Sequence, residues 1–193
     1  MNVDELTRLV ESKPAPAPLL ALQAFVNTLD AESGADELGS PAEFRGWLQR
    51  TELERPPIDV SEDDLRRARE LRGTLRSLLA ANAHGEVDHA AARKLHSHLD
   101  RRHIPLTVDR SGRLELDLSP ARSVEELLSL LIGIAFQAQV EGRWERLKLC
   151  QNDECQWAFF DASRNRGGAW CQMRVCGNRI KNRHYRRRHR ARA

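Results

Sequence analysis

Apolar residues recur at helical spacing through most of the first 140 positions. In the run from Leu19 to Leu29 they repeat at intervals of three and four, which predicts a helix with Pro18 as its first residue and an end near residues 32–34. Three more helices are each introduced by a serine that an acidic residue follows three positions later, as in a capping box. These pairs are Ser40 with Glu43, Ser61 with Asp64 and Ser123 with Glu126.

Between the capping signals at Ser61 and Ser123, the spacing of the apolar residues changes from that of a helix to that of a strand. A shorter helix is expected over residues 87–100. In residues 104–118 apolar and polar positions then alternate on both sides of the turn-forming residues 109–112, which predicts a β-hairpin. The helix that follows Ser123 is strongly apolar, so we expect it at the centre of the core. Residues 1–142 are therefore predicted to form a mainly helical domain with one hairpin.

The cysteines form two close pairs near the C-terminus. Their positions are Cys150, Cys155, Cys171 and Cys176. Two such pairs, separated by a stretch that folds back on itself, are typical of a tetrahedral Zn²⁺ site closed by four thiolates. Side chains five positions apart point in different directions from a regular helix, so we expect a knuckle loop for the first pair. A strand at 157–161, a turn at 165–168 and a return strand at 170–171 would follow, with the last cysteine at the entrance to the final helix.

Two disulfides, or four unrelated buried thiols, are the alternatives to a metal site. A module of about 50 residues with few aliphatic side chains usually needs a metal or disulfides to hold its fold, and reducing conditions inside a cell disfavour disulfides. We therefore predict one structural zinc per chain, without an open coordination position for catalysis. The predicted fold class is α+β, in which residues 143–193 form a small four-cysteine zinc-finger domain with a knuckle, a hairpin and a C-terminal helix.

Charge divides the chain at the same place. Residues 143–193 hold 14 Lys and Arg against 4 Asp and Glu, a net charge of +10, whereas residues 1–142 carry −7. The last 17 residues hold eight cationic side chains and no acidic one, which indicates a polyanionic partner. Six of the ten aromatic residues also lie in the C-terminal part. The predicted domains are therefore 1–142 and 143–193.

Several short motifs in the C-terminal part resemble a known family. They are Arg146-Leu147-Lys148-Leu149-Cys150, Asp161-Ala162-Ser163-Arg164-Asn165, Trp170-Cys171 and Cys176-Gly177-Asn178-Arg179. Together they resemble the CGNR zinc-finger family, found at the C-terminus of bacterial proteins regarded as candidate stress-induced transcription regulators. Upstream, residues 20–22 and 25–28 are similar to the start of the ABATE domain that accompanies this finger, although Ala24 stands where an Asp is expected. The resemblance implies DNA binding.

The basic C-terminus supplies the candidate nucleic-acid contacts. If residues 178–192 form a helix, arginines recur on one face at intervals of four, three and four, a spacing that suits a phosphate backbone. The candidate contacts are Arg164, Arg166, Asn178, Arg179, Lys181, Arg183, Arg186, Arg187 and Arg190. We predict a DNA-binding transcriptional regulator. The alternatives are an RNA-binding protein, or a small-molecule-binding stress protein whose basic tail is only a solvated surface.

Other classes of function find little support in the sequence. The chain has no Gly-rich phosphate loop and no Gly-x-Ser-x-Gly elbow, so we do not expect an enzyme. Asn27 and Thr28 are candidate ligand-binding groups if the N-terminal domain senses a small-molecule effector. A homodimer is a further expectation. No apolar run is long enough to cross a membrane, and residues 1–18 do not resemble a secretory signal, so we expect a cytoplasmic protein.

Overall fold

The computed structural model describes residues 1–85, 88–100 and 103–190, and it confirms the predicted α+β architecture. The helices within these ranges are α1 (Val3–Val10), α2 (Leu19–Val26), α3 (Pro41–Thr51), α4 (Glu62–His84), α5 (His89–Leu99), α6 (Val124–Val140) and α7 (Asn178–Arg190). Two antiparallel hairpins accompany them, β1 (Leu106–Val108) with β2 (Leu114–Leu116) and β3 (Leu147–Leu149) with β4 (Ala158–Phe160). A 3₁₀ turn (Trp144–Arg146) precedes β3, and a π-helical turn (Met173–Gly177) leads into α7.

The three serine capping signals mark real helix starts. The side chains of Ser40, Ser61 and Ser123 each accept a hydrogen bond from the backbone N–H three residues later, which satisfies a donor that the helix itself cannot use. The shorter predicted helix is also present as α5, which Asp88 caps by accepting from two backbone N–H groups. Its predicted first residue, Val87, lies outside the described residues.

One helix boundary differs from the sequence prediction, and one helix was not predicted. Helix α2 ends at Val26 rather than near residues 32–34, because the next side chains form hydrogen bonds other than those of a continuing helix. The Thr28 hydroxyl donates to the Phe25 carbonyl oxygen, and Asp30 caps a turn over residues 30–34. Helix α1 was not predicted, although Asn2 caps it.

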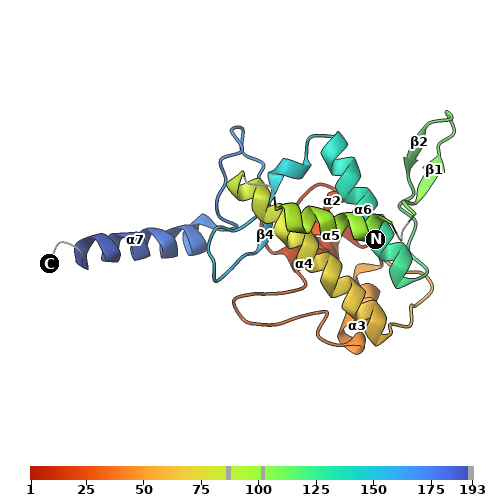
Figure 1. Cartoon of the computed structure of the whole chain (residues 1–193), viewed down its shortest axis with the longest axis horizontal. Coiled ribbons are helices and arrows are strands. Elements are labelled where there is room, and N and C mark those ends of the chain that lie inside the picture. The colour runs from red at the N-terminus through yellow and green to blue at the C-terminus, as the bar shows by residue number, and fades with distance from the viewer. Residues whose placement is uncertain (86–87, 101–102, 191–193) are drawn as a thin grey trace.

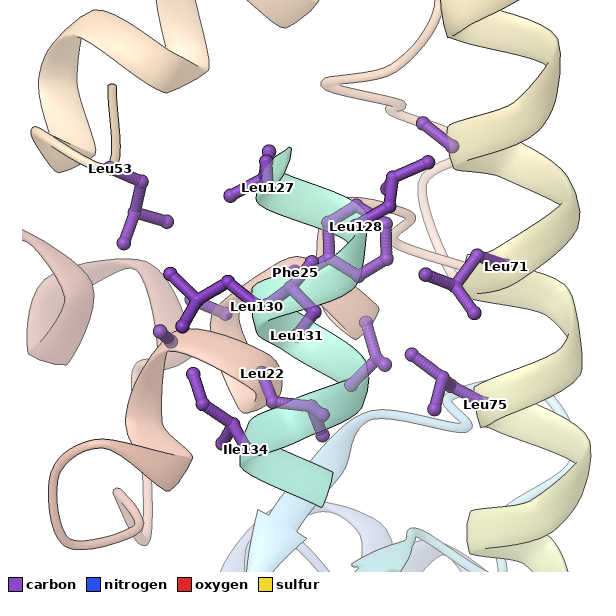
Figure 2. Close-up of a cluster of buried hydrophobic side chains, with 14 of the residues drawn as sticks. Leu22, Phe25, Leu53, Leu71, Leu75, Leu127, Leu128, Leu130, Leu131 and Ile134 are labelled. Atoms are coloured by element: carbon purple, nitrogen blue, oxygen red, sulfur yellow. The ribbon is translucent and has the colours of Figure 1, made fainter. Parts of the chain in front are cut away.

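Helix α6 lies at the centre of the apolar core, as its composition predicts. Figure 2 shows it between α2 on one side and α4 on the other, with leucine side chains from all three meeting around Phe25. The labelled core residues are Leu22, Phe25, Leu53, Leu71, Leu75, Leu127, Leu128, Leu130, Leu131 and Ile134. Burying side chains of this size contributes about 1.5–3 kcal/mol each, so this cluster dominates the stability of the helical part.

The β3–β4 hairpin belongs to the same core. Leu147, Leu149 and Ala158 are buried against the helical cluster, and β3 packs closely on α4. The apolar core therefore continues across residue 142, where the sequence predicted a domain boundary. A second, smaller cluster consists of Phe159 and the four cysteines.

Two elements project from this body in opposite directions. Figure 1 shows α7 extending from one end and the β1–β2 hairpin standing away from the other. Within the described residues, no helix is both long and apolar enough to cross a membrane.

Candidate metal centre and basic helix

The four cysteines come from three places in the fold. Cys150 directly follows β3, and Cys155 lies on the knuckle turn between β3 and β4, as predicted. Cys171 lies on an irregular segment after the 161–168 loop, and Cys176 lies in the π-helical turn at the entrance to α7. All four side chains are buried, and their sulfur atoms lie within 4.8 Å of one another.

The sulfur positions fit a zinc ion. A tetrahedron with Zn–S bonds of about 2.3 Å has S···S edges of about 3.8 Å. The Sγ atoms of Cys155 and Cys171 are 3.6 Å apart, and those of Cys171 and Cys176 are 3.7 Å apart, so each distance is close to such an edge. These separations are far longer than a disulfide bond of about 2.05 Å. The centre therefore binds one structural zinc, and four thiolates leave no open position on it.

Electrostatics inside the cluster requires a cation. Hydrogen bonds from the Cys155 and Cys171 side chains lower the pKa of Cys150 to about 2. Once Cys150 carries a negative charge, its hydrogen bond and its charge raise the pKa of Cys155 to about 12, and they raise that of Cys171 as well. Four thiolates share this buried site only when a metal ion compensates their charge.

Nearby polar groups orient the ligands. Asn152 is fully buried in the knuckle, and its Nδ2 donates to the Cys176 Sγ at 3.8 Å. The carbonyl oxygen of the same residue accepts from the backbone N–H of Cys155 at 2.8 Å, which closes the knuckle turn. Such contacts behind the ligands fix their geometry in metal sites.

The sequence predicts a return strand at residues 170–171, but in the structure these residues form no strand. Strand β4 pairs with the preceding β3, in the register Leu147 with Phe160 and Leu149 with Ala158. The chain after the 161–168 loop makes a single backbone bond to the knuckle, from the Gln151 N–H to the Ala169 carbonyl oxygen at 3.0 Å. The far edge of β4 is occupied instead by the N-terminal segment, because the Phe160 N–H donates to the Lys13 carbonyl oxygen at 2.9 Å.

The last residue of α1 and the residues between α1 and α2 clamp the zinc region, which runs from β3 to the start of α7, to the preceding helices. The Trp157 indole donates to the Val10 carbonyl oxygen at 2.9 Å, and the Ser12 hydroxyl donates to the carbonyl oxygen of the zinc ligand Cys171 at 3.2 Å. The Lys13 ammonium lies 4.6 Å from the centre of the Phe159 ring and also donates to the Trp170 carbonyl oxygen. The sequence offered no signal for these contacts because they join residues about 150 positions apart.

Helix α2 adds a second clamp through two buried amides. Asn27 pairs with the backbone of Ala158 in both directions, accepting from its N–H at 2.8 Å and donating to its carbonyl oxygen at 2.9 Å. Gln23 donates to the same carbonyl oxygen at 3.1 Å. A glutamine and an asparagine in an otherwise apolar helical run are a signal that such buried polar bonds exist.

The two predicted ligand-binding residues are thus engaged within the protein. Asn27 holds β4, and Thr28 accepts a hydrogen bond from Arg72, whose guanidinium also forms a two-pronged ion pair with Asp36. Burial alone would raise the pKa of Asp36, but the hydrogen bonds from Arg72 and the Leu38 N–H outweigh it and lower that pKa. A ligand-binding role for Asn27 and Thr28 stays a prediction.

The 161–168 loop is held rigidly by a buried carboxylate. Asp161 is only 3% exposed, and it accepts from the Lys148 ammonium at 3.0 Å, the Ser163 hydroxyl at 2.6 Å and the Gly168 N–H at 2.7 Å. Burial raises the pKa of Asp161, but the hydrogen bonds from Ser163 and Lys148 outweigh that effect and hold it well below the usual value. The loop carries the predicted contacts Arg164 and Arg166 on its exposed side.

Helix α7 presents its cations to solvent. The side chains exposed to solvent are those of Asn178, Arg179, Lys181, Arg183, Arg186 and Arg187, and the Arg190 side chain lies outside the described part of the structure. Near the root of the helix, Arg179 pairs with Glu32 at 2.6 Å and Arg183 pairs with Glu154 at 2.8 Å. A shallow groove beside these pairs is lined by Glu154, Asn182 and four arginines of the helix.

These features define a helical domain that carries a C-terminal zinc finger of the four-cysteine class, with a basic helix directly after its last ligand. Residues 146–189 match the CGNR zinc finger, and residues 20–139 match ABATE, a family described as "Putative stress-induced transcription regulator". The chain belongs to this ABATE family, as its motifs predict. No curated protein matches it.

Proposed function

We propose that this protein is a DNA-binding transcriptional regulator that lays α7 along the phosphate backbone of duplex DNA. The observation that carries the proposal is the exposed arginine face of a helix that projects from the body and is anchored at its root. Cationic side chains on such a helix release counterions from DNA, which provides most of the affinity.

The zinc centre supplies the anchor for that helix. Its last ligand, Cys176, lies two residues before α7, so the metal fixes the direction in which the helix leaves the body. In the free protein the ion pairs of Arg179 with Glu32 and of Arg183 with Glu154 also restrain the first turns, although both arginines must leave these carboxylates to contact DNA. A preoriented helix loses less conformational freedom on binding than a flexible tail does.

The candidate contacts divide into two groups. Arg183, Arg186, Arg187 and Lys181 are proposed phosphate contacts, joined by Arg164 and Arg166 from the rigid loop and by Arg190 at the end of the helix. Asn178 and Arg179 are proposed base contacts, because Asn suits adenine and Arg suits guanine. In the free protein the Asn178 amide donates to the Arg174 carbonyl oxygen, and Arg179 pairs with Glu32, so both bonds must open for base contact.

A salt series on the zinc-loaded full chain tests the proposal. The logarithm of affinity for duplex DNA should fall linearly with the logarithm of salt concentration, at a slope of about −0.9 per phosphate contact and so about −6 for the seven proposed contacts. Arg186→Ala should weaken binding to every sequence and reduce the slope by about one contact's share. The matched control is Arg45→Ala, which removes one exposed cation from α3 and should leave the slope unchanged.

A triple variant gives the decisive result. Arg183→Gln, Arg186→Gln and Arg187→Gln together should abolish most of the affinity while leaving the zinc content intact. If this variant keeps its zinc and binds duplex DNA as tightly as the unmodified chain, the basic helix is only a solvated surface and the proposal fails. Tighter binding to RNA than to duplex DNA at equal salt would favour the RNA-binding alternative.

A further inference from the structure

The β1–β2 hairpin exposes an apolar face to solvent. Its register places Leu106 opposite Leu116 and Val108 opposite Leu114, so these four side chains share one face. Leu106 and Val108 are each 59% exposed, and Leu114 is 73% exposed. The apolar face of an ordinary hairpin packs against a core, whereas most of this one is left uncovered by the described residues.

Only the base of the hairpin is seated on the body. Leu116 and Ile104 pack over Gly133 of α6, where an added Cβ would lie 2.5 Å from the Leu116 Cδ1 atom. The glycine therefore lets the hairpin approach the helix closely at this point. An isolated two-stranded hairpin is marginally stable in water, so the exposed part of this one needs a surface that covers it.

Helix α6 carries a matching apolar strip beside the base. Phe136 is 62% exposed and Val140 is 72% exposed. Residues 133, 136 and 140 lie on the same side of a helix, so the strip begins where the hairpin is seated and continues toward the C-terminal end of α6. A projecting apolar face and a flat apolar strip are thus adjacent on one molecule.

We propose that these two surfaces form the interface of a symmetric homodimer. The apolar face of the β1–β2 hairpin of one copy covers Phe136 and Val140 of the second copy, and the second hairpin covers the same strip on the first. A two-fold axis permits this reciprocal pairing because each copy supplies both halves of the contact. The inference does not depend on the proposed DNA binding.

The exposed apolar area is sufficient for such a dimer. At roughly 30 Å² per buried CH₂ group, the five side chains Leu106, Val108, Leu114, Phe136 and Val140 each offer about 100 Å². Two copies then bury about 1,000 Å² of apolar surface before any polar rim is counted, and a specific interface needs about that area. A lone copy would instead leave an apolar patch at the upper end of what monomers expose.

Charge favours a second copy as the occupant. The turn and the adjoining strand position carry Asp109, Arg110, Arg113 and Glu115, two charges of each sign, so two copies approach without net repulsion at this end. The strongly cationic α7 projects from the opposite end and stays free in the proposed dimer (Figure 1).

Sedimentation equilibrium of the zinc-loaded full chain tests the proposal. The protein should be a dimer with a dissociation constant in the micromolar range, and Leu114→Lys and Phe136→Lys should each raise that constant at least tenfold. Both positions are exposed, so zinc content should stay as in the unmodified chain, and so should thermal unfolding measured at a concentration where both proteins are monomeric. The matched control is Tyr185→Lys on α7, which places a lysine at a side chain 57% exposed and should not change dimerisation.

A cross-linking experiment tests the arrangement independently. When a Leu114→Cys variant is mixed with a Val140→Cys variant and mildly oxidised, peptide mass spectrometry should find a disulfide between the two introduced cysteines. A monomer at about 100 μM, a dimer insensitive to both lysine variants, or a dimer sensitive to only one would overturn the proposal. Absence of the mixed disulfide in a confirmed dimer would also overturn it.

Discussion

Replacing Asn27 by alanine should loosen the attachment of the zinc region to the helical body. In the structure, Asn27 is 6% exposed and makes two hydrogen bonds to the backbone of Ala158. Alanine removes both bonds but leaves the backbone of β4 in place. The loss of stability depends on how each of the two bonded groups of Ala158, its N–H and its carbonyl oxygen, is left.

The N–H of Ala158 loses the one partner it has among the described residues, whereas the carbonyl oxygen keeps its bond from Gln23. A buried donor without a partner costs about 1–3 kcal/mol, and the space left by the amide group adds about 1 kcal/mol. We therefore expect Asn27→Ala to lower the free energy of unfolding by about 3 kcal/mol. For a chain of this size that loss corresponds to a decrease in Tm of about 6–12 °C.

Urea denaturation in zinc-containing buffer, followed by tryptophan fluorescence, measures the loss of stability. Hydrogen exchange should in addition show faster exchange at the Ala158 amide. The control is Asn182→Ala, which changes an exposed asparagine on α7 and should alter stability by less than about 0.5 kcal/mol. If Asn27→Ala lies within that same limit, or if exchange in β4 does not change, the side chain does not hold the two parts together as argued.

The remaining predictions concern the metal and the rigid loop. Elemental analysis of the purified protein should find one zinc per chain, and a zinc-free native protein would contradict this. The Cys171→Ser variant should lose the metal, and its hydrogen exchange should rise more over residues 150–177 than in α2 or α6. Asp161→Asn should lower stability at pH 7 by about 2–4 kcal/mol, because Lys148 loses its buried charge partner. Since the folded pKa of Asp161 is depressed, its contribution is fully present above the unfolded value of about 3.9 and is lost as pH falls further. In urea titrations at fixed zinc concentration, the difference in stability between the unmodified chain and Asp161→Asn should thus be constant from pH 5.5 to 8 and should shrink below about pH 4. A difference that grows as the pH falls would refute the stabilising role of the Asp161 carboxylate.

Features with a local physical cause were predictable from the sequence. The capping serines determine helix starts because their hydroxyls bond to N–H groups three residues away. Apolar composition placed α6 in the core, and the paired cysteines indicated a four-thiolate metal site before any distance was known. The run of cations after Cys176 likewise identified α7 as the basic surface.

Features that join distant segments were decided only by the tertiary structure. Strand β4 pairs with β3 and with the Lys13 backbone, rather than with residues 170–171, because those two segments occupy its edges in the folded chain. The arginines at the root of α7 are likewise held by distant partners, because Arg179 pairs with Glu32, 147 positions away, and Arg183 pairs with Glu154, 29 positions away. Hydrogen bonds and ion pairs of this kind depend on where the core brings the segments together, and the spacing of residues along one chain does not contain that information.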